Sequence, residues 1–298
     1  YIAITQNVVN IIASLGLVYL CGMKVEGVAL GTLIAQYAGF LMGIVLWMHN
    51  YGRLKRFWEI KNYKLKIKGG EGAGIWEKGA MFRFFQVNRD IFLRTLCLVA
   101  VTLFFTSAGA SQGEIILAVN TLLMQLFTLF SYVMDGFAYA GEALSGRYIG
   151  ARNREAFTDT VRHLFGWGAV IAVLFTLVYA LGGNAFLGLL TDDKEVIAVA
   201  DTYFYWALAV PAVGIAAFIW DGIFIGATAT RGMLLSMAAA AVSFFILYYG
   251  LHPVLANHAL WLAFLTYLLM RGVVQTGLSR EVIRRAFPSK KEPAWREG

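Results

Sequence analysis

Charged residues are scarce in this chain: only 14% of its 298 residues are Asp, Glu, Lys or Arg, while 59% are hydrophobic. A soluble domain carries about 25% charged residues, so a water-facing surface of this composition would expose large apolar patches and aggregate. The apolar residues lie in blocks of about 20 residues, the length of a helix that crosses the hydrocarbon core of a bilayer. The scarcity of charge therefore argues against a soluble protein and indicates a membrane protein.

Cysteine, histidine and proline are also rare, with two, four and four residues respectively. Cys21 and Cys97 lie in or beside apolar blocks and form no CxxC pair, which argues against a disulfide framework and a cysteine zinc site. The chain has no HExxH helix and no phosphate loop ending in GKS or GKT, and it has no GxSxG nucleophile elbow. We therefore expect no metal, no cofactor and no enzyme; a membrane-embedded enzyme is the least favoured alternative.

Eight apolar segments are long enough to be membrane-spanning helices, whereas a barrel strand would alternate over about 10 residues. The segments are Ile4–Met23, Val25–Met48, Ile91–Ser107, Ile115–Leu144, Leu164–Leu187, Tyr203–Thr228, Met233–Leu251 and Ala259–Leu278. The sequence thus predicts an all-α polytopic membrane protein.

Lysine and arginine collect in alternate connections between these segments, chiefly in residues 50–79, 147–162 and 280–298. The connections between them hold few cations. Because cytoplasmic loops are enriched in Lys and Arg, we expect the basic connections and both chain ends to face the cytoplasm. The basic residues form no stripe interleaved with aromatic side chains, so we expect the bilayer, and not a nucleic acid, as the partner.

The segment Ile115–Leu144 carries polar residues three and four apart among Leu, Phe, Met and Val. These residues are Thr121, Gln125, Thr128, Tyr132, Asp135, Tyr139 and Glu142. On a helix this spacing makes one continuous polar face, which lipid would not solvate. The face either lines a translocation cavity, with Asp135 as a titratable group, or joins helices through hydrogen bonds.

Further ionisable residues fall at membrane depth, where they are usually functional. Asp90 and Arg94 are four residues apart, a spacing that favours an ion pair along one helix. With the expected topology, Arg94, Asp135, Asp221 and Arg271 share one layer in the cytoplasmic third of the bilayer. We hypothesise that ion pairs in this layer close the cytoplasmic side and that protonation of Asp135 or Asp221 weakens the closure; a permanent structural network is the alternative.

These patterns define the candidate site. Candidate residues of a substrate and ion pathway are Gln125, Tyr132, Asp135, Tyr139, Asp221 and Arg94. Candidate residues of a cytoplasmic gate, or of structural ion pairs, are Asp90, Arg94, Glu142 and Arg271.

Four motifs stand out in chain order. They are NRDIFLRT at 88–95, DGFAYAGEA at 135–143, DGIFIGAT at 221–228 and NHALWLA at 257–263. Together they resemble segments of the DinF-type transporters in the MATE (multidrug and toxic compound extrusion) family. The resemblance covers essentially the whole chain and implies helices five to twelve of a 12-helix fold with two lobes.

The resemblance implies a division of the chain. Residues 1–49 would be the last two helices of the N-lobe, 50–79 a cytoplasmic linker between lobes, 80–279 a six-helix C-lobe and 280–298 a basic cytoplasmic tail. Helices one to four of the family would precede Tyr1 and be absent here, so we expect this chain alone not to transport.

The resemblance also implies a function: a secondary antiporter of the bacterial inner membrane, monomeric, that exports amphipathic and often cationic drugs in exchange for H⁺ or Na⁺ by alternating access. Na⁺-coupled relatives use acidic residues of the seventh and tenth helices. Here the seventh helix has Arg94, and the register of Asp221 does not clearly match, which favours H⁺. A flippase for lipid-linked glycans is the alternative, and it should show cationic side chains along its cavity.

Overall fold

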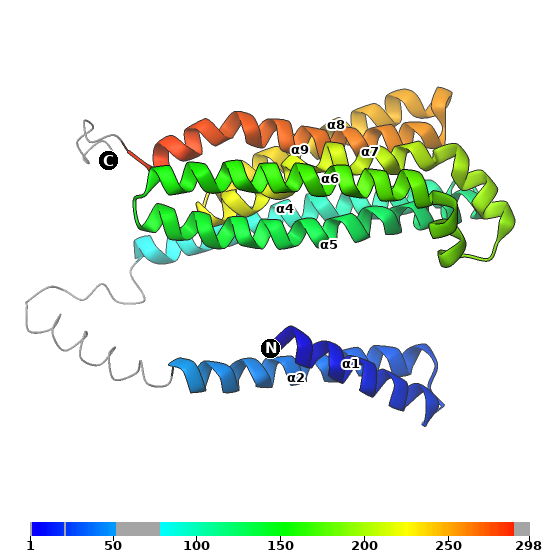
Figure 1. Ribbon diagram of the computed structural model, residues 1–298, viewed down its shortest axis with the longest axis horizontal. Coiled ribbons are helices and arrows are strands. Elements are labelled where there is room, and N and C mark those ends of the chain that lie inside the picture. The colour runs from blue at the N-terminus through cyan, green and yellow to red at the C-terminus, as the bar shows by residue number, and fades with distance from the viewer. Residues whose placement is uncertain (1, 21, 52–77, 289–298) are drawn as a thin grey trace, which may run out of the picture. The chain divides into compact units, whose positions relative to one another are not determined.

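The computed structural model describes residues 2–20, 22–51 and 78–288. Within these ranges the chain forms eight α-helices and no strand (Figure 1), which confirms the predicted fold class. The helices are α1 (Ile2–Tyr19), α2 (Val25–Tyr51), α4 (Lys78–Ala110), α5 (Glu114–Gly150), α6 (Arg154–Leu190), α7 (Lys194–Gly226), α8 (Thr230–Leu255) and α9 (Asn257–Ala286).

The helices α2 and α4 to α9 are long and apolar enough to cross a membrane, and they are the only such helices among the described residues. Helix α1 is shorter, because it ends at Tyr19 and not at Met23 as predicted. Just beyond it, Gly22 has a φ of +67°, the left-handed conformation that commonly follows a helix end. Most other helices are longer than the apolar segments predicted for them, because polar and charged residues extend the helix at one or both ends.

The chain divides into two compact units, Tyr1–Lys78 and Gly79–Gly298. Of the predicted linker, residues 52–77 lie outside the described residues, and so do residues 289–298 of the predicted tail. The first residues of the predicted tail continue α9, which ends at Ala286.

In the first unit, α1 and α2 pack closely along a row of small residues on α2. Gly27, Gly31, Ala35 and Gly39 follow one another at four-residue spacing. A Cβ atom at Gly31 would collide with Ser14, and one at Gly39 would collide with the side chain of Gln6. Small residues at this spacing let membrane helices approach closely.

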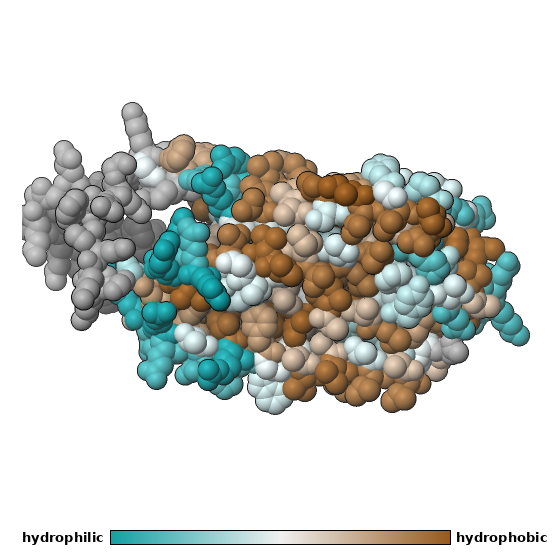
Figure 2. All heavy atoms as spheres, turned by 90° about the horizontal axis from the view of Figure 1, so that it is seen from above, coloured by the Kyte–Doolittle hydropathy of each residue, from teal (hydrophilic) through white to brown (hydrophobic). Residues whose placement is uncertain are grey.

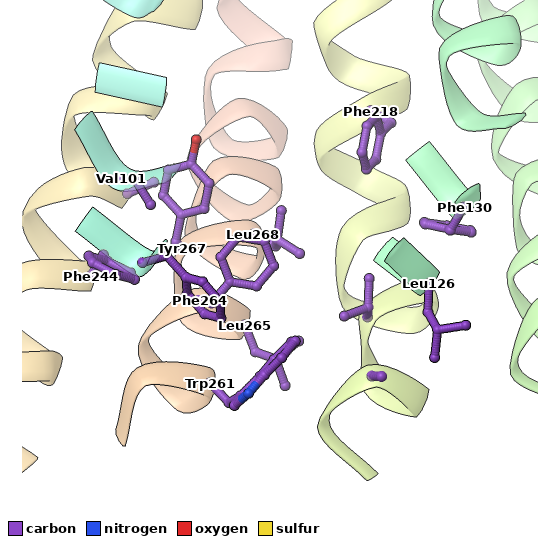
Figure 3. Packing of buried hydrophobic residues seen from close by; sticks show 14 of the residues in the cluster. Val101, Leu126, Phe130, Phe218, Phe244, Trp261, Phe264, Leu265, Tyr267 and Leu268 are labelled. Carbon is purple, nitrogen blue, oxygen red and sulfur yellow. The ribbon is translucent and has the colours of Figure 1, made fainter. Parts of the chain in front are cut away.

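The second unit is built around α7 and α9, whose apolar stretches are mostly buried. In Figure 3 the large side chains of α9, among them Trp261, Phe264 and Tyr267, lie beside Val101 of α4 and Phe244 of α8. Edge-to-face contacts connect this cluster further, for example Phe127 with Phe264 at 5.1 Å between ring centroids. Such contacts add to the stabilisation that buried aromatic area provides.

Helices α5 and α7 touch through their backbones. A Cβ atom on Gly222 of α7 would overlap the carbonyl oxygen of Ala138, and one on Gly226 would overlap that of Glu142. The two glycines are four residues apart and so face α5 together. This contact fixes Asp221, the neighbour of Gly222, next to the polar half of α5.

Helix α4 is attached differently, because it is not among the closely packed helix pairs. Long side chains join it to its neighbours. Phe104 contacts Phe245 and Tyr248 of α8, each with ring centroids 5.0 Å apart, and Phe105 contacts Trp261 of α9 at 5.2 Å.

The two ends of the second unit differ in charge. Hydrophilic side chains gather at both ends of the view in Figure 2, with a broad apolar band between them. The α5–α6 turn and the end of α9 meet at one end (Figure 1), with exposed Arg147, Arg152, Arg154, Arg284 and Arg285. The opposite end holds the α6–α7 turn with Asp192 and Asp193.

Candidate functional site

A buried cluster of charge joins α4, α7 and α9 around the carboxylate of Asp221. Arg94 Nη2 and Arg271 Nη2 both donate to Asp221 Oδ2, the latter at 2.7 Å. Gln275 Nε2 donates to the other oxygen, Oδ1, at 2.5 Å. Asp221, Arg271 and Gln275 are buried, and the side chain of Arg94 is 19% exposed. A carboxylate at membrane depth is thus satisfied by three donors.

The helices explain why these side chains meet. Arg271 and Gln275 are four residues apart on α9, so they lie on the same face of that helix. The guanidinium of Arg271 also lies over two rings, 5.5 Å from the centroid of Tyr267 and 5.9 Å from that of Phe218. Two arginines and one aspartate leave a surplus of positive charge, and the Nε atoms of both arginines are buried without a hydrogen-bond partner.

The polar residues of α5 lie on the face of that helix turned away from the core. The core face of α5 carries residues such as Leu123, Leu126, Phe130 and Met134. On the other face, Tyr132 and Tyr139 are 71% and 70% exposed, and Gln125 is also exposed. Thr128, Asp135 and Glu142 of the same face are half-buried. Thr121 and Thr128 donate only to carbonyl oxygens of their own helix.

Asp135 connects this face to the buried cluster. It is half-buried on α5, between Tyr132 and Tyr139 along the chain. Its carboxylate is near enough to be repelled by Asp221 and attracted by Arg271. No ion pair or hydrogen bond of the Asp135 side chain occurs among the described residues. Asp135 is therefore a second carboxylate close to the same surplus of positive charge.

The predicted ion pair between Asp90 and Arg94 is wrong. Asp90 is buried and bonds instead with Arg89, whose Nη2 lies 2.9 Å from Asp90 Oδ1, and with Thr230 of α8, whose hydroxyl lies 3.4 Å from Oδ2. Arg94 points to Asp221 because that buried carboxylate needs donors, while Asp90 accepts from Arg89 of its own helix and from Thr230 at the start of α8. Glu142, also a candidate, is half-buried and forms no salt bridge among the described residues.

Gln275 was not among the predicted residues, because an uncharged amide gives little signal in a sequence. Its position one turn after Arg271 was the available clue. The described residues contain no group of three or more His, Cys, Asp or Glu side chains that could hold a metal ion. The site is thus a buried ion-pair network with one further carboxylate nearby.

A second buried polar group lies where α5 begins and α9 begins. Asn120 and Asn257 donate to each other at 2.8 and 2.9 Å, and Trp261 Nε1 donates to Asn120 Oδ1 at 2.8 Å. All three side chains are buried. This group ties the two helix ends together, away from the Asp221 cluster.

Comparisons with known proteins agree on one family. The MatE family model matches residues 91–254. DNA damage-inducible protein F of Escherichia coli K12 is 38% identical over 270 residues, which are 91% of this chain and 56% of that protein. Protein DETOXIFICATION 42 of Arabidopsis thaliana is 20% identical over 92% of this chain and 50% of its own length. The chain thus spans about half the length of these relatives.

Solved structures agree in fold. A crystal structure of MATE in the bent conformation has a TM-score of 0.74 at 15% identity, over 96% of this chain and 61% of that one. The Vibrio cholerae MATE transporter VcmN in its bent form has a TM-score of 0.67 at 14% identity, over 96% and 62%. At such low identity the likeness concerns the fold alone.

Proposed function

Because this chain belongs to the MATE family of multi-pass membrane transporters, whose members are not enzymes, we propose that the protein works as a secondary efflux antiporter. It exports amphipathic, often cationic compounds in exchange for H⁺ by alternating access. The observation that carries the proposal is the exposed polar face of α5, with Asp135 beside the buried Arg94–Asp221–Arg271 cluster.

The polar face of α5 is the proposed contact surface for the substrate. Tyr132 and Tyr139 present aromatic rings that attract organic cations, and the carboxylate of Asp135 between them supplies the opposite charge. A proton on Asp135 removes that charge. Proton and substrate then compete for one carboxylate, which is the simplest physical basis for exchange.

The Asp221 cluster is the proposed gate on the cytoplasmic side. Ionised Asp221 holds Arg94 of α4 and Arg271 of α9 together. A proton on Asp221 removes the charge that both guanidinium groups share, so both ion pairs weaken and α4 is released at this level. Acidification at the site therefore favours opening, and loss of the proton favours closure.

The test measures efflux of a fluorescent organic cation from energised bacteria that lack their own exporters. Cells express the full-length parent protein, with all twelve helices that the family implies, or its Asp135→Asn or Asp221→Asn variant, and external pH and Na⁺ are varied. We expect efflux to collapse with the proton gradient, to be independent of Na⁺, and to lose its pH dependence in both variants. Asp201→Asn, an exposed position on α7, should behave like the unchanged protein. Unaltered pH dependence in both site variants would refute the proposal.

A flippase for lipid-linked glycans is the second candidate, favoured by one observation. The cluster holds two guanidinium groups for one carboxylate, a surplus that suits a phosphate group. Absence of efflux for every cation tested, with good membrane expression, would favour this candidate over the antiporter.

Further features of the proposal follow from composition and family. We infer a monomer in the bacterial cell membrane, with both chain ends in the cytoplasm because the arginine-rich end of the second unit carries the positive charge.

A further inference from the structure

Gln275 has one hydrogen bond too few. The side chain is completely buried on α9, and its Nε2 donates to Asp221 Oδ1. Its carbonyl oxygen, Oε1, is buried with no hydrogen-bond partner. A buried acceptor without a donor is unfavourable, and it is uncommon in folded proteins.

The chemistry of the partners decides how the amide must point. An ionised carboxylate only accepts hydrogen bonds, so Gln275 must turn its NH₂ group toward Asp221 in this state. Arg94 and Arg271 carry donors only. Of the three side chains that bond Asp221, only Gln275 therefore has an acceptor to offer.

This inventory changes when Asp221 takes up a proton. The proton bonds to Oδ1, the negative charge disappears, and the new O–H group needs an acceptor. A half turn of the Gln275 amide brings Oε1 to that O–H. The turn pairs the orphaned oxygen with the new donor and moves the NH₂ group to the place that Oε1 held, while Arg94, released from its pair, is free to leave.

We propose that Gln275 is a positioning residue that serves both protonation states of Asp221, donating through Nε2 to the carboxylate and accepting through Oε1 from the carboxylic acid. This inference rests on the proposed role of Asp221 as a proton site. It makes proton uptake at Asp221 possible without leaving a buried O–H group unpaired.

Other charged and titratable groups face the same carboxylate. They are Arg94 on α4, Asp135 on α5, and Arg271 and Tyr267 on α9. The Tyr267 hydroxyl donates to Met237 Sδ at 2.9 Å and is thus engaged elsewhere. The arginines set how readily Asp221 is protonated, whereas Gln275 sets whether each form is hydrogen-bonded.

Infrared difference spectroscopy of the purified protein tests the inference, because carbonyl bands report hydrogen bonding directly. On acidification we expect a carboxylic acid C=O band that is absent in Asp221→Asn. In protein carrying isotopically labelled glutamine, an amide C=O band should shift in the same pH range, and this shift should be lost in Asp221→Asn. This part needs no change at Gln275.

The variant Gln275→Met keeps the side-chain volume and removes both donor and acceptor. In it, the Asp221 acid band should move to the position of an acid without a hydrogen bond. Ser279→Ala, one turn further along α9, is the matched control, because Ser279 bonds only the carbonyl oxygen of Thr276, and it should leave both bands unchanged.

The outcomes separate the two proposals. An acid band assigned to Asp221 with no change in any glutamine band, and with the same position in Gln275→Met, overturns the role of Gln275 and leaves the proton site standing. Absence of an Asp221 acid band at every pH overturns both.

Discussion

Asn120 shows at the scale of single residues how much a buried polar side chain contributes. Its oxygen accepts from Trp261 and Asn257, so Asn120→Leu leaves two buried donors without partners. We expect the variant to lose about 2–4 kcal/mol of unfolding free energy, measured by denaturant unfolding in detergent. Thr121→Leu, at an exposed neighbour that bonds only its own helix, should change it by less than about 0.5 kcal/mol. Equal losses of unfolding free energy in Asn120→Leu and Thr121→Leu would contradict the role of the buried hydrogen bonds of Asn120.

The sequence predicted Arg94, Asp221 and Arg271 as one layer because charges at membrane depth are rare enough to stand out. It could not predict which side chains would pair. Asp90 and Arg94 fit the spacing of a helical ion pair, yet Arg94 bonds Asp221, 127 residues away in the chain. Local spacing holds no information on such distant partners. The uncharged amides Gln275 and Asn120 give little signal in a sequence, and the only clue to Gln275 was its position one turn after Arg271.

Helix α7 shows why one contact depends on the absence of a side chain. Gly222→Ala would drive a Cβ atom into the carbonyl oxygen of Ala138, so we expect a loss of about 1–3 kcal/mol in unfolding free energy. Gly136→Ala on α5, where nothing lies near, should gain up to about 1 kcal/mol from helix propensity. Denaturant unfolding of both variants measures the two changes in unfolding free energy, which should have opposite signs. A Gly222→Ala variant as stable as the unchanged protein would contradict the close contact.

The turn between α8 and α9 consists of one strained residue. Ala256 has φ 45° and ψ −121°, a conformation that suits glycine. We expect Ala256→Gly to raise the unfolding free energy by about 1 kcal/mol. The same change at Ala259, which is buried in helical conformation, should lower it by about that amount or more. Thermal unfolding of both variants gives the two signs, and a destabilised Ala256→Gly would refute the strain.

For the whole molecule, the sequence predicted the helical fold because hydropathy and helix length follow directly from the bilayer. Of the eight predicted spans, seven correspond to described helices long and apolar enough to cross a membrane, and α1 is shorter. It placed the start of α4 too late and the end of α9 too early, since hydropathy cannot detect a helix that continues beyond its apolar stretch.

The orientation of the molecule is open to a direct test. In a background without native cysteines, Asp192→Cys should react with a membrane-impermeant thiol reagent in intact cells, because the α6–α7 turn lies at the poorly basic end. Thr158→Cys, exposed near the arginines of α6, should react only after permeabilisation. Labelling in the reverse order would invert the proposed topology.

Helix α4 is attached differently along its length, so it can tilt about one half when the other half is released. The C-terminal half of α4 packs through Phe104 and Phe105 against α8 and α9. The N-terminal half is held by the polar bonds of Asp90 and Arg94. From Phe104 to Arg89 the helix is about 22 Å long. If the bonds of Asp90 and Arg94 break, a tilt of α4 by about 10° around Phe104 and Phe105 moves Arg89 sideways by roughly 4 Å. This is more than the diameter of a water molecule.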